Sequence, residues 1–301
     1  MNDRPRERRR LAAFFILVFA VSWGAWWAAA LGGGEWTSFP TVLLFTLGGA
    51  GPLIATVILV RTTLARDRRC AFVRRIVDPR PIANRWLIVI IALTLAPALA
   101  GQWLAAAAGD GSAWHGEWRG PASFAGIVAF NLVASLAEEP GWRGYAYDRA
   151  RSFMGLRAAS LLIGGVWLLW HVPLYFVDGT FQNQHGFMSQ GFFAYSLALI
   201  PAAVIYGWVV ARSGFSVLAA VVLHLVDNVA GEVLDLNVGA QLGRALILSV
   251  VAVLLWRSWR TGEPPVSRPR VQTGTGGGPQ PPEGRVIASG MTQASNSSAL
   301  T

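Results

Sequence analysis

The sequence predicts an all-α fold: a polytopic membrane protein with about eight transmembrane helices around a polar intramembrane cavity. Composition is the first observation, because 53% of the 301 residues are hydrophobic and only 14% are charged, whereas a soluble domain carries roughly 25% charged residues. The mean hydropathy of +0.44 agrees. The 14 tryptophans fit a chain that crosses two bilayer interfaces, where Trp concentrates. Two further observations are the spacing of the apolar segments and the placement of arginine.

Eight apolar segments approach the length of about 20 residues that a helix needs to cross the hydrocarbon core. They are 11–31, 39–60, 86–107, 121–138, 158–177, 191–211, 214–234 and 239–257. The first of them follows a basic stretch, as a signal peptide would. Because it is long and contains three tryptophans, we expect it to remain as the first helix.

Arginine orients these segments, since all 25 basic residues are arginines. Connection 61–85 holds eight of them, whereas connections 32–38 and 178–190 hold none. The positive-inside rule assigns the arginine-rich connections to the cytoplasm. We therefore predict a multi-pass protein of the plasma membrane with both termini cytoplasmic. The net charge of +9 follows from this topology, and we predict no nucleic-acid partner.

The segment pattern divides the chain into three regions. Residues 1–10 form a basic cytoplasmic N-terminus, and 11–257 form the membrane domain. Residues 258–301 are rich in Pro, Gly and Ser, so we predict a disordered cytoplasmic tail. A single cysteine excludes an internal disulfide and a Cys-rich zinc site.

The stretch SLAEEPGWRGYAY places two carboxylates and an arginine at the end of an apolar segment. Ionisable groups at membrane depth are expensive and suggest function. Because Pro140 lacks a backbone donor, we expect the helix to kink or pause at Glu138 and Glu139. In a continuous helix, Glu139 and Arg143 would be at i,i+4 and could pair, which leaves Glu138 free to take a proton. The alternative is a solvated helix end with a surface ion pair.

Two other segments carry histidine at membrane depth. His171 lies in WLLWHVPLYF, and His224 shares one helix face with Asn228 at i,i+4. Each could instead be a structural residue that hydrogen-bonds to a backbone carbonyl or to a neighbouring helix.

Glu138, His171, His224 and Asn228 lie on three separate segments, so only folding can bring them together. Such a set suits hydrolysis by an activated water: a carboxylate takes the proton, a histidine positions the water, and donors hold the oxyanion. If a metal is present, Glu138, His171 and His224 could be its ligands, with zinc as one candidate. A metal-free mechanism also stays open, and the zinc-protease signature HExxH is absent from the sequence.

The pattern resembles the three motifs of the CPBP intramembrane proteases, EExxxR, FxxxH and HxxxN, a family that includes CAAX prenyl endopeptidases of the Rce1 type and Abi-type proteins. The matching positions are Glu138, Glu139, Arg143, His171, His224 and Asn228. One departure is Trp167, which stands where the second motif usually begins with Phe. We interpret it as a packing substitution by another large aromatic residue.

The resemblance implies an intramembrane endopeptidase with a core at about 121–234. By this resemblance Glu138 activates water with help from His171, and His224 and Asn228 hold the oxyanion or the hydrogen-bond network. Glu139 and Arg143 would support the site. The implied partners are the lipid bilayer and a membrane-associated peptide or protein, either a prenylated CAAX-type substrate or a bacteriocin-like one. The family has been described both as metalloproteases and as metal-free glutamate peptidases.

Two other functions use the same residues. A proton-coupled transporter could use the buried Glu and His as a relay, although the sequence shows no internal repeat. A non-catalytic membrane scaffold is the other alternative, although every motif position carries a competent residue.

Depth is a further constraint, because His171 lies about 14 residues, or roughly 20 Å, into its segment. It can meet Glu138 only if that helix begins later, or if the chain stays buried through Tyr145 and Tyr147. We expect a cavity open to the cytoplasmic side.

Overall fold

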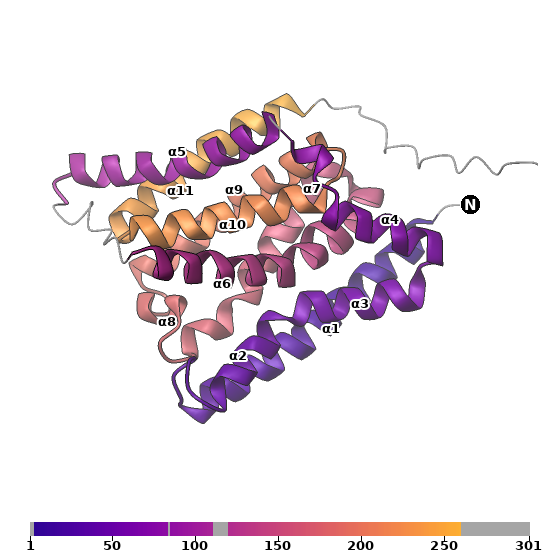
Figure 1. Cartoon of the computed structure of the whole chain (residues 1–301), viewed down its shortest axis with the longest axis horizontal. Helices are drawn as coiled ribbons and strands as arrows, with labels where there is room; N and C mark the ends of the chain where they lie inside the picture. The colour runs from indigo at the N-terminus through magenta and orange to yellow at the C-terminus, as the bar shows by residue number, and fades with distance from the viewer. Residues whose placement is uncertain (1–2, 84, 111–119, 260–301) are drawn as a thin grey trace, which may run out of the picture. The chain divides into compact units, whose positions relative to one another are not determined.

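The computed structural model describes residues 3–83, 85–110 and 120–259. All regular elements in this part of the chain are helices, joined by turns and loops, and it contains no strand (Figure 1). The α-helices are α1 (Arg4–Gly32), α2 (Thr41–Gly49), α3 (Gly51–Thr63), α4 (Arg66–Val77), α5 (Arg85–Ala107), α6 (Pro121–Glu139), α7 (Tyr147–Trp170), α8 (Phe181–His185), α9 (Gln190–Arg212), α10 (Val217–Leu234) and α11 (Val238–Ser258). Short 3₁₀ turns occur at η1 (Arg80–Ile82) and η3 (Val172–Phe176), and η2 (Pro140–Ala146) is a π-helix. The predicted tail lies outside the described residues, apart from its first two positions.

The predicted class, an all-α polytopic membrane protein, is confirmed. By length and composition, six helical stretches of the described residues could cross a membrane, or seven if α2 and α3, bent by 49°, form one span. The count of eight is not confirmed. Segments 121–138 and 158–177 fall within one helical stretch, Pro121–Phe176. The chain stays helical past the glutamates, but Gly155 inside α7 has non-helical dihedrals, φ 82° and ψ 170°, so a break separates the two segments.

A π-helix replaces the kink that we expected at Pro140. Pro140 has helical dihedrals, φ −57° and ψ −33°, and the N–H of Tyr147 donates to the carbonyl of Trp142, five residues back. A proline cannot donate in the ladder and its ring crowds the carbonyl four residues back. The wider turn accommodates both effects, so α6 runs on into α7. Such single π turns occur frequently at functional sites.

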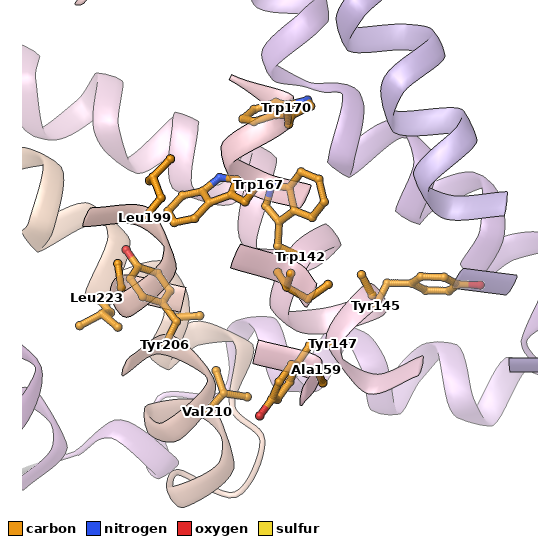
Figure 2. Close-up of a cluster of buried hydrophobic side chains, with 14 of the residues drawn as sticks. Trp142, Tyr145, Tyr147, Ala159, Trp167, Trp170, Leu199, Tyr206, Val210 and Leu223 are labelled. Atoms are coloured by element: carbon orange, nitrogen blue, oxygen red, sulfur yellow. The ribbon is translucent and has the colours of Figure 1, made fainter. Parts of the chain in front are cut away.

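All seven residues of η2 are buried. Phe14 of α1 packs edge-on against Trp142 and stacks on Tyr145, with ring centroids 5.6 Å apart in both pairs. Figure 2 shows Trp142, Tyr145 and Tyr147 within the buried aromatic cluster. The chain therefore stays buried through Tyr145 and Tyr147. The non-helical break at Gly155, about midway between Glu138 and His171, turns the chain back, so Trp167 can donate to Glu138.

The helices around this turn bring distant parts of the chain side by side. Helix α7 packs on α9, α10 packs on α6 and α5, and α11 lies along α5 and α9 (Figure 1). Side-chain caps start the last three long helices: Ser189, Ser216 and Asn237 each accept from the backbone N–H three residues on. These caps satisfy donors that a helix start would otherwise leave without a partner.

We expect Gly141→Ala to destabilise the protein by about 1–3 kcal/mol, as overpacking of a tight core does. A Cβ at Gly141 would lie 2.8 Å from both the Cβ and the carbonyl oxygen of Pro52 on α3. Thermal unfolding of the purified protein in detergent should show a lower Tm.

Gly165→Ala in α7 is the matched control, because a Cβ there meets nothing within 4 Å. We expect an unchanged or higher Tm, since alanine favours the helix. Equal Tm values for Gly141→Ala and the wild type would contradict the close approach of η2 and α3.

Candidate active site

Glu139, the last residue of α6, is fully buried and joins three elements. Its Oε1 accepts from Arg143 Nη1 of η2 at 2.9 Å and from His224 Nδ1 of α10 at 2.8 Å. The expected pair with Arg143 is therefore present, and His224 is a second partner that the sequence did not indicate. Because charged partners offset its burial, this carboxylate is held in one position.

Two aromatic rings hold the guanidinium of Arg143. Its Cζ lies 4.3 Å from the ring centroid of Trp167 and 4.2 Å from that of Tyr206. A guanidinium is planar and weakly hydrated, so it stacks on aromatic faces where an ammonium would not. The two rings and Glu139 therefore hold the side chain in place although it is almost fully buried.

Glu138 has a different environment from its neighbour and is only partly buried. Its Oε2 accepts from Trp167 Nε1 at 2.8 Å. No other residue in the described part of the chain hydrogen-bonds to its Oε1 or forms an ion pair with it. Glu139 is thus held by an arginine and a histidine, whereas Glu138 keeps one oxygen for a further partner.

His171 follows the last turn of α7, and its ring nitrogens have different roles. Nδ1 lies 2.7 Å from the carbonyl of Trp167. A carbonyl only accepts, so Nδ1 carries the proton and Nε2 keeps a lone pair. The ring contacts Trp167, Trp170 and Tyr195 edge-on, at centroid distances of 5.5, 4.8 and 5.7 Å. These contacts determine where Nε2 points.

Trp167 lies at the centre of these contacts. Its indole binds Glu138, covers one face of Arg143, and contacts the rings of both His171 and His224, at 5.5 and 5.7 Å. Figure 2 labels Trp167 within the buried cluster, with Tyr206, whose ring it contacts at 5.9 Å. The interpretation as a packing substitution was incomplete, since a phenyl ring has no N–H for Glu138. The sequence could have indicated this contact, because a buried Trp N–H usually has a hydrogen-bond acceptor.

The structure thus gathers most of the predicted site. Five of the six predicted residues contact Trp167 directly or through one another: Glu138, Glu139, Arg143, His171 and His224. Asn228 lies one turn beyond His224 on α10, partly exposed, and its side chain makes no hydrogen bond with any described residue. Tyr206 is the residue that sequence reasoning missed altogether, because nothing local marks a helical tyrosine as a partner for arginine.

Other polar residues of α10 have structural partners. Asp227 Oδ1 accepts from Arg244 of α11 at 2.6 Å, and Glu232 Oε1 accepts from Asn131 of α6 at 2.9 Å. These contacts tie α10 to α11 and α6.

We tested whether the donors present could hold a metal. In the described ranges, no three His, Cys, Asp or Glu side chains are placed to do so. The set that we considered from the sequence, Glu138, His171 and His224, is therefore not grouped as a metal site. Both Nδ1 atoms and one oxygen of Glu138 already have partners. We derive no step through a metal.

Comparison with known proteins identifies a related family. Residues 120–230, which span α6 to α10, match the family model described as Type II CAAX prenyl endopeptidase Rce1-like. The chain is also 28% identical over 251 residues to CAAX prenyl protease 2 of Methanococcus maripaludis, covering 80% of this chain and 91% of that protein. The resemblance drawn from the motifs is therefore confirmed, and it supports a membrane protease.

We expect Arg143→Ala to destabilise the fold by about 3–5 kcal/mol, because it leaves the buried charge of Glu139 without its main partner. The two side chains are 2% and 0% exposed. A fall in Tm of the purified protein would measure the effect.

Arg80→Ala is the control, because Arg80 pairs with Asp78 on the surface with 79% of its side chain exposed, and exposed pairs contribute little. Its Tm should match that of the wild type. If both variants unfold at the wild-type temperature, the pair with Glu139 does not hold the fold together.

Proposed function

We propose that this chain, a relative of the CAAX prenyl endopeptidases, is an intramembrane endopeptidase in which Glu138 activates the attacking water. Its substrate is a membrane-associated peptide or protein, of the prenylated CAAX type or of a bacteriocin-like type. The observation that carries the proposal is the difference between two adjacent glutamates: Glu139 is held by Arg143 and His224, whereas Glu138 keeps a free oxygen.

A water molecule has two O–H bonds, and two acceptors are available for them. Oε1 of Glu138 can accept one, and Nε2 of His171 can accept the other, since Nδ1 of that ring already donates to a carbonyl. Together they would aim the water oxygen at a peptide carbonyl. Orientation of this kind removes much of the entropic barrier.

In the chemical step the water oxygen bonds to the carbonyl carbon while Glu138 takes the water proton. The carbonyl oxygen becomes an oxyanion, for which the amide N–H of Asn228 is the natural donor. Nε2 of His224 can also donate when that ring is protonated, with the carboxylate of Glu139 offsetting the charge. Collapse of the intermediate breaks the C–N bond, and Glu138 returns its proton to the leaving nitrogen.

Glu139 and Arg143 support this chemistry without touching the substrate. Glu139 determines the tautomer of His224 and its ring direction, as a carboxylate behind a histidine does in many sites. Arg143 balances the charge of Glu139 and packs between Trp167 and Tyr206. The two alternatives, a proton-coupled transporter and a scaffold, would use the same residues without bond cleavage.

We expect Glu138→Gln to lower kcat by about 10²–10⁴, the usual contribution of a general base, with little change in Tm. Peptides released from membranes of wild-type and Glu138→Gln cells, compared by mass spectrometry, would identify a substrate. The purified variants would then be assayed on it.

Glu35→Gln is the matched control, because Glu35 is an exposed glutamate in a connection. Full cleavage by both Glu138→Gln and His171→Ala would refute the catalytic assignment. A wild-type protein that moves protons across liposomes and cleaves no peptide would favour the transporter.

We also propose that the arginine-rich connections face the cytoplasm, as the charge distribution suggests. Cys70 on α4 is exposed and is the only cysteine of the chain, so it reports the side on which 61–85 lies. We expect a membrane-impermeant maleimide to label it in inside-out vesicles and to leave it unlabelled in intact cells.

Leu31→Cys in a Cys70→Ala background is the control for the opposite side, because Leu31 is 87% exposed at the end of α1. It should be labelled in intact cells. The reverse pattern at the two positions would invert the topology.

A further inference from the structure

We propose that Trp167 is a positioning residue for Glu138: its indole N–H holds one carboxylate oxygen so that the other faces the reacting water. The inference rests on the proposed function and adds to it a residue that the motif does not assign. The motif usually has Phe at this position, and a phenyl ring has no hydrogen-bond donor.

The hydrogen bond can orient a carboxylate only if the indole itself is held. Trp167 is 5% exposed, and its ring contacts Tyr206 at 5.9 Å and both imidazoles at less than 6 Å. Arg143 covers its face. The N–H therefore has one direction, and Glu138 Oε2 lies on it at 2.8 Å.

The contact is not a general consequence of burying tryptophan in this fold. Trp142, Trp170 and Trp259 are also buried, and in the described residues their Nε1 atoms have no hydrogen-bond partner. Burial in this protein thus does not by itself give an indole a partner, although buried Trp26 donates to the carbonyl of Phe45. At Trp167 the N–H meets Glu138, the glutamate of the site whose side chain has no other hydrogen bond in the described structure.

The same ring also connects Glu138 to the rest of the site. Glu138 has no direct bond to Arg143 or His224 in the described structure, whereas Trp167 contacts both. A shift of the ring would therefore move the base relative to the histidines. Loss of the N–H alone would leave the packing and free the carboxylate to rotate.

Hydrogen bonds to charged groups are strong enough that loss of this one should lower kcat about 10- to 100-fold. KM should be unchanged, because Trp167 does not touch the substrate in this scheme. A carboxylate that loses a donor holds its proton more tightly. The acidic limb of the pH–kcat profile should therefore move to higher pH, which a purely structural role would not cause.

Two variants separate the N–H from the ring. Trp167→Phe removes both the donor and part of the volume, whereas 3-benzothienylalanine at position 167 keeps the shape and replaces N–H by sulfur. Trp259→Phe is the matched control, because this indole is buried against Trp256, its N–H has no partner among the described residues, and it contacts no residue of the site. The assay uses a farnesylated CAAX-type peptide or the peptide identified with Glu138→Gln, together with Tm.

A second measurement needs no substrate. In ¹⁵N-indole NMR spectra of the detergent-solubilised protein, the Trp167 cross-peak is the one lost in Trp167→Phe. It should move with pH and should shift in Glu138→Leu, while the Trp259 cross-peak stays in place.

The inference holds if both position-167 variants lose kcat and shift the acidic limb at near wild-type Tm while Trp259→Phe does neither. Unchanged kcat and acidic limb in the benzothienyl protein, or an indole signal insensitive to Glu138→Leu, would overturn it and leave the proposed function standing. A wild type that cleaves no peptide would overturn the proposed function, and the positioning role with it.

Discussion

The structure of the site depends on one buried carboxylate oxygen. Oε1 of Glu139 accepts from Arg143 and from His224, so a single atom joins α6, η2 and α10. In a low-dielectric interior an unpaired charge is very costly. The hydrogen bonds that satisfy Glu139 therefore constrain the positions of η2 and α10. Arg143 must reach back along its own helix, and α10 must present His224 at one depth. The aromatic rings of Trp167 and Tyr206 then have a guanidinium to pack against.

The π-helix makes that arrangement possible. A regular α-helix through Pro140 would lose a bond and crowd a carbonyl, and a sharp kink would carry Arg143 away from Glu139. The wider turn keeps the backbone helical and keeps the i,i+4 pair within 2.9 Å. It also keeps Trp142 and Tyr145 in the core, against α1. The first helix, outside the three motifs, is thus part of what holds the site.

Adjacent glutamates with different partners explain how one short motif can serve two purposes. Glu139 lies among permanent partners and has a structural role. Glu138 has one neutral donor and a free oxygen, which suits a group that must exchange a proton. Trp167, which supplies this donor, also contacts Arg143 and both histidines. It therefore links Glu138 to the rest of the site.

The sequence by itself determined the class of fold and five of the residues that converge, because apolar runs and costly intramembrane charges are local features. Spacing alone also implied the pair of Glu139 and Arg143. Only the tertiary structure decided how the chain passes Pro140, because α and π turns differ by the register of one hydrogen bond and that choice depends on packing against α1 and α3. It alone assigned His224 to Glu139, Tyr206 to Arg143 and Trp167 to Glu138, since these contacts join residues far apart in the chain. For the same reason it distinguished the two glutamates: their identical side chains differ only in the neighbours that folding brings to them.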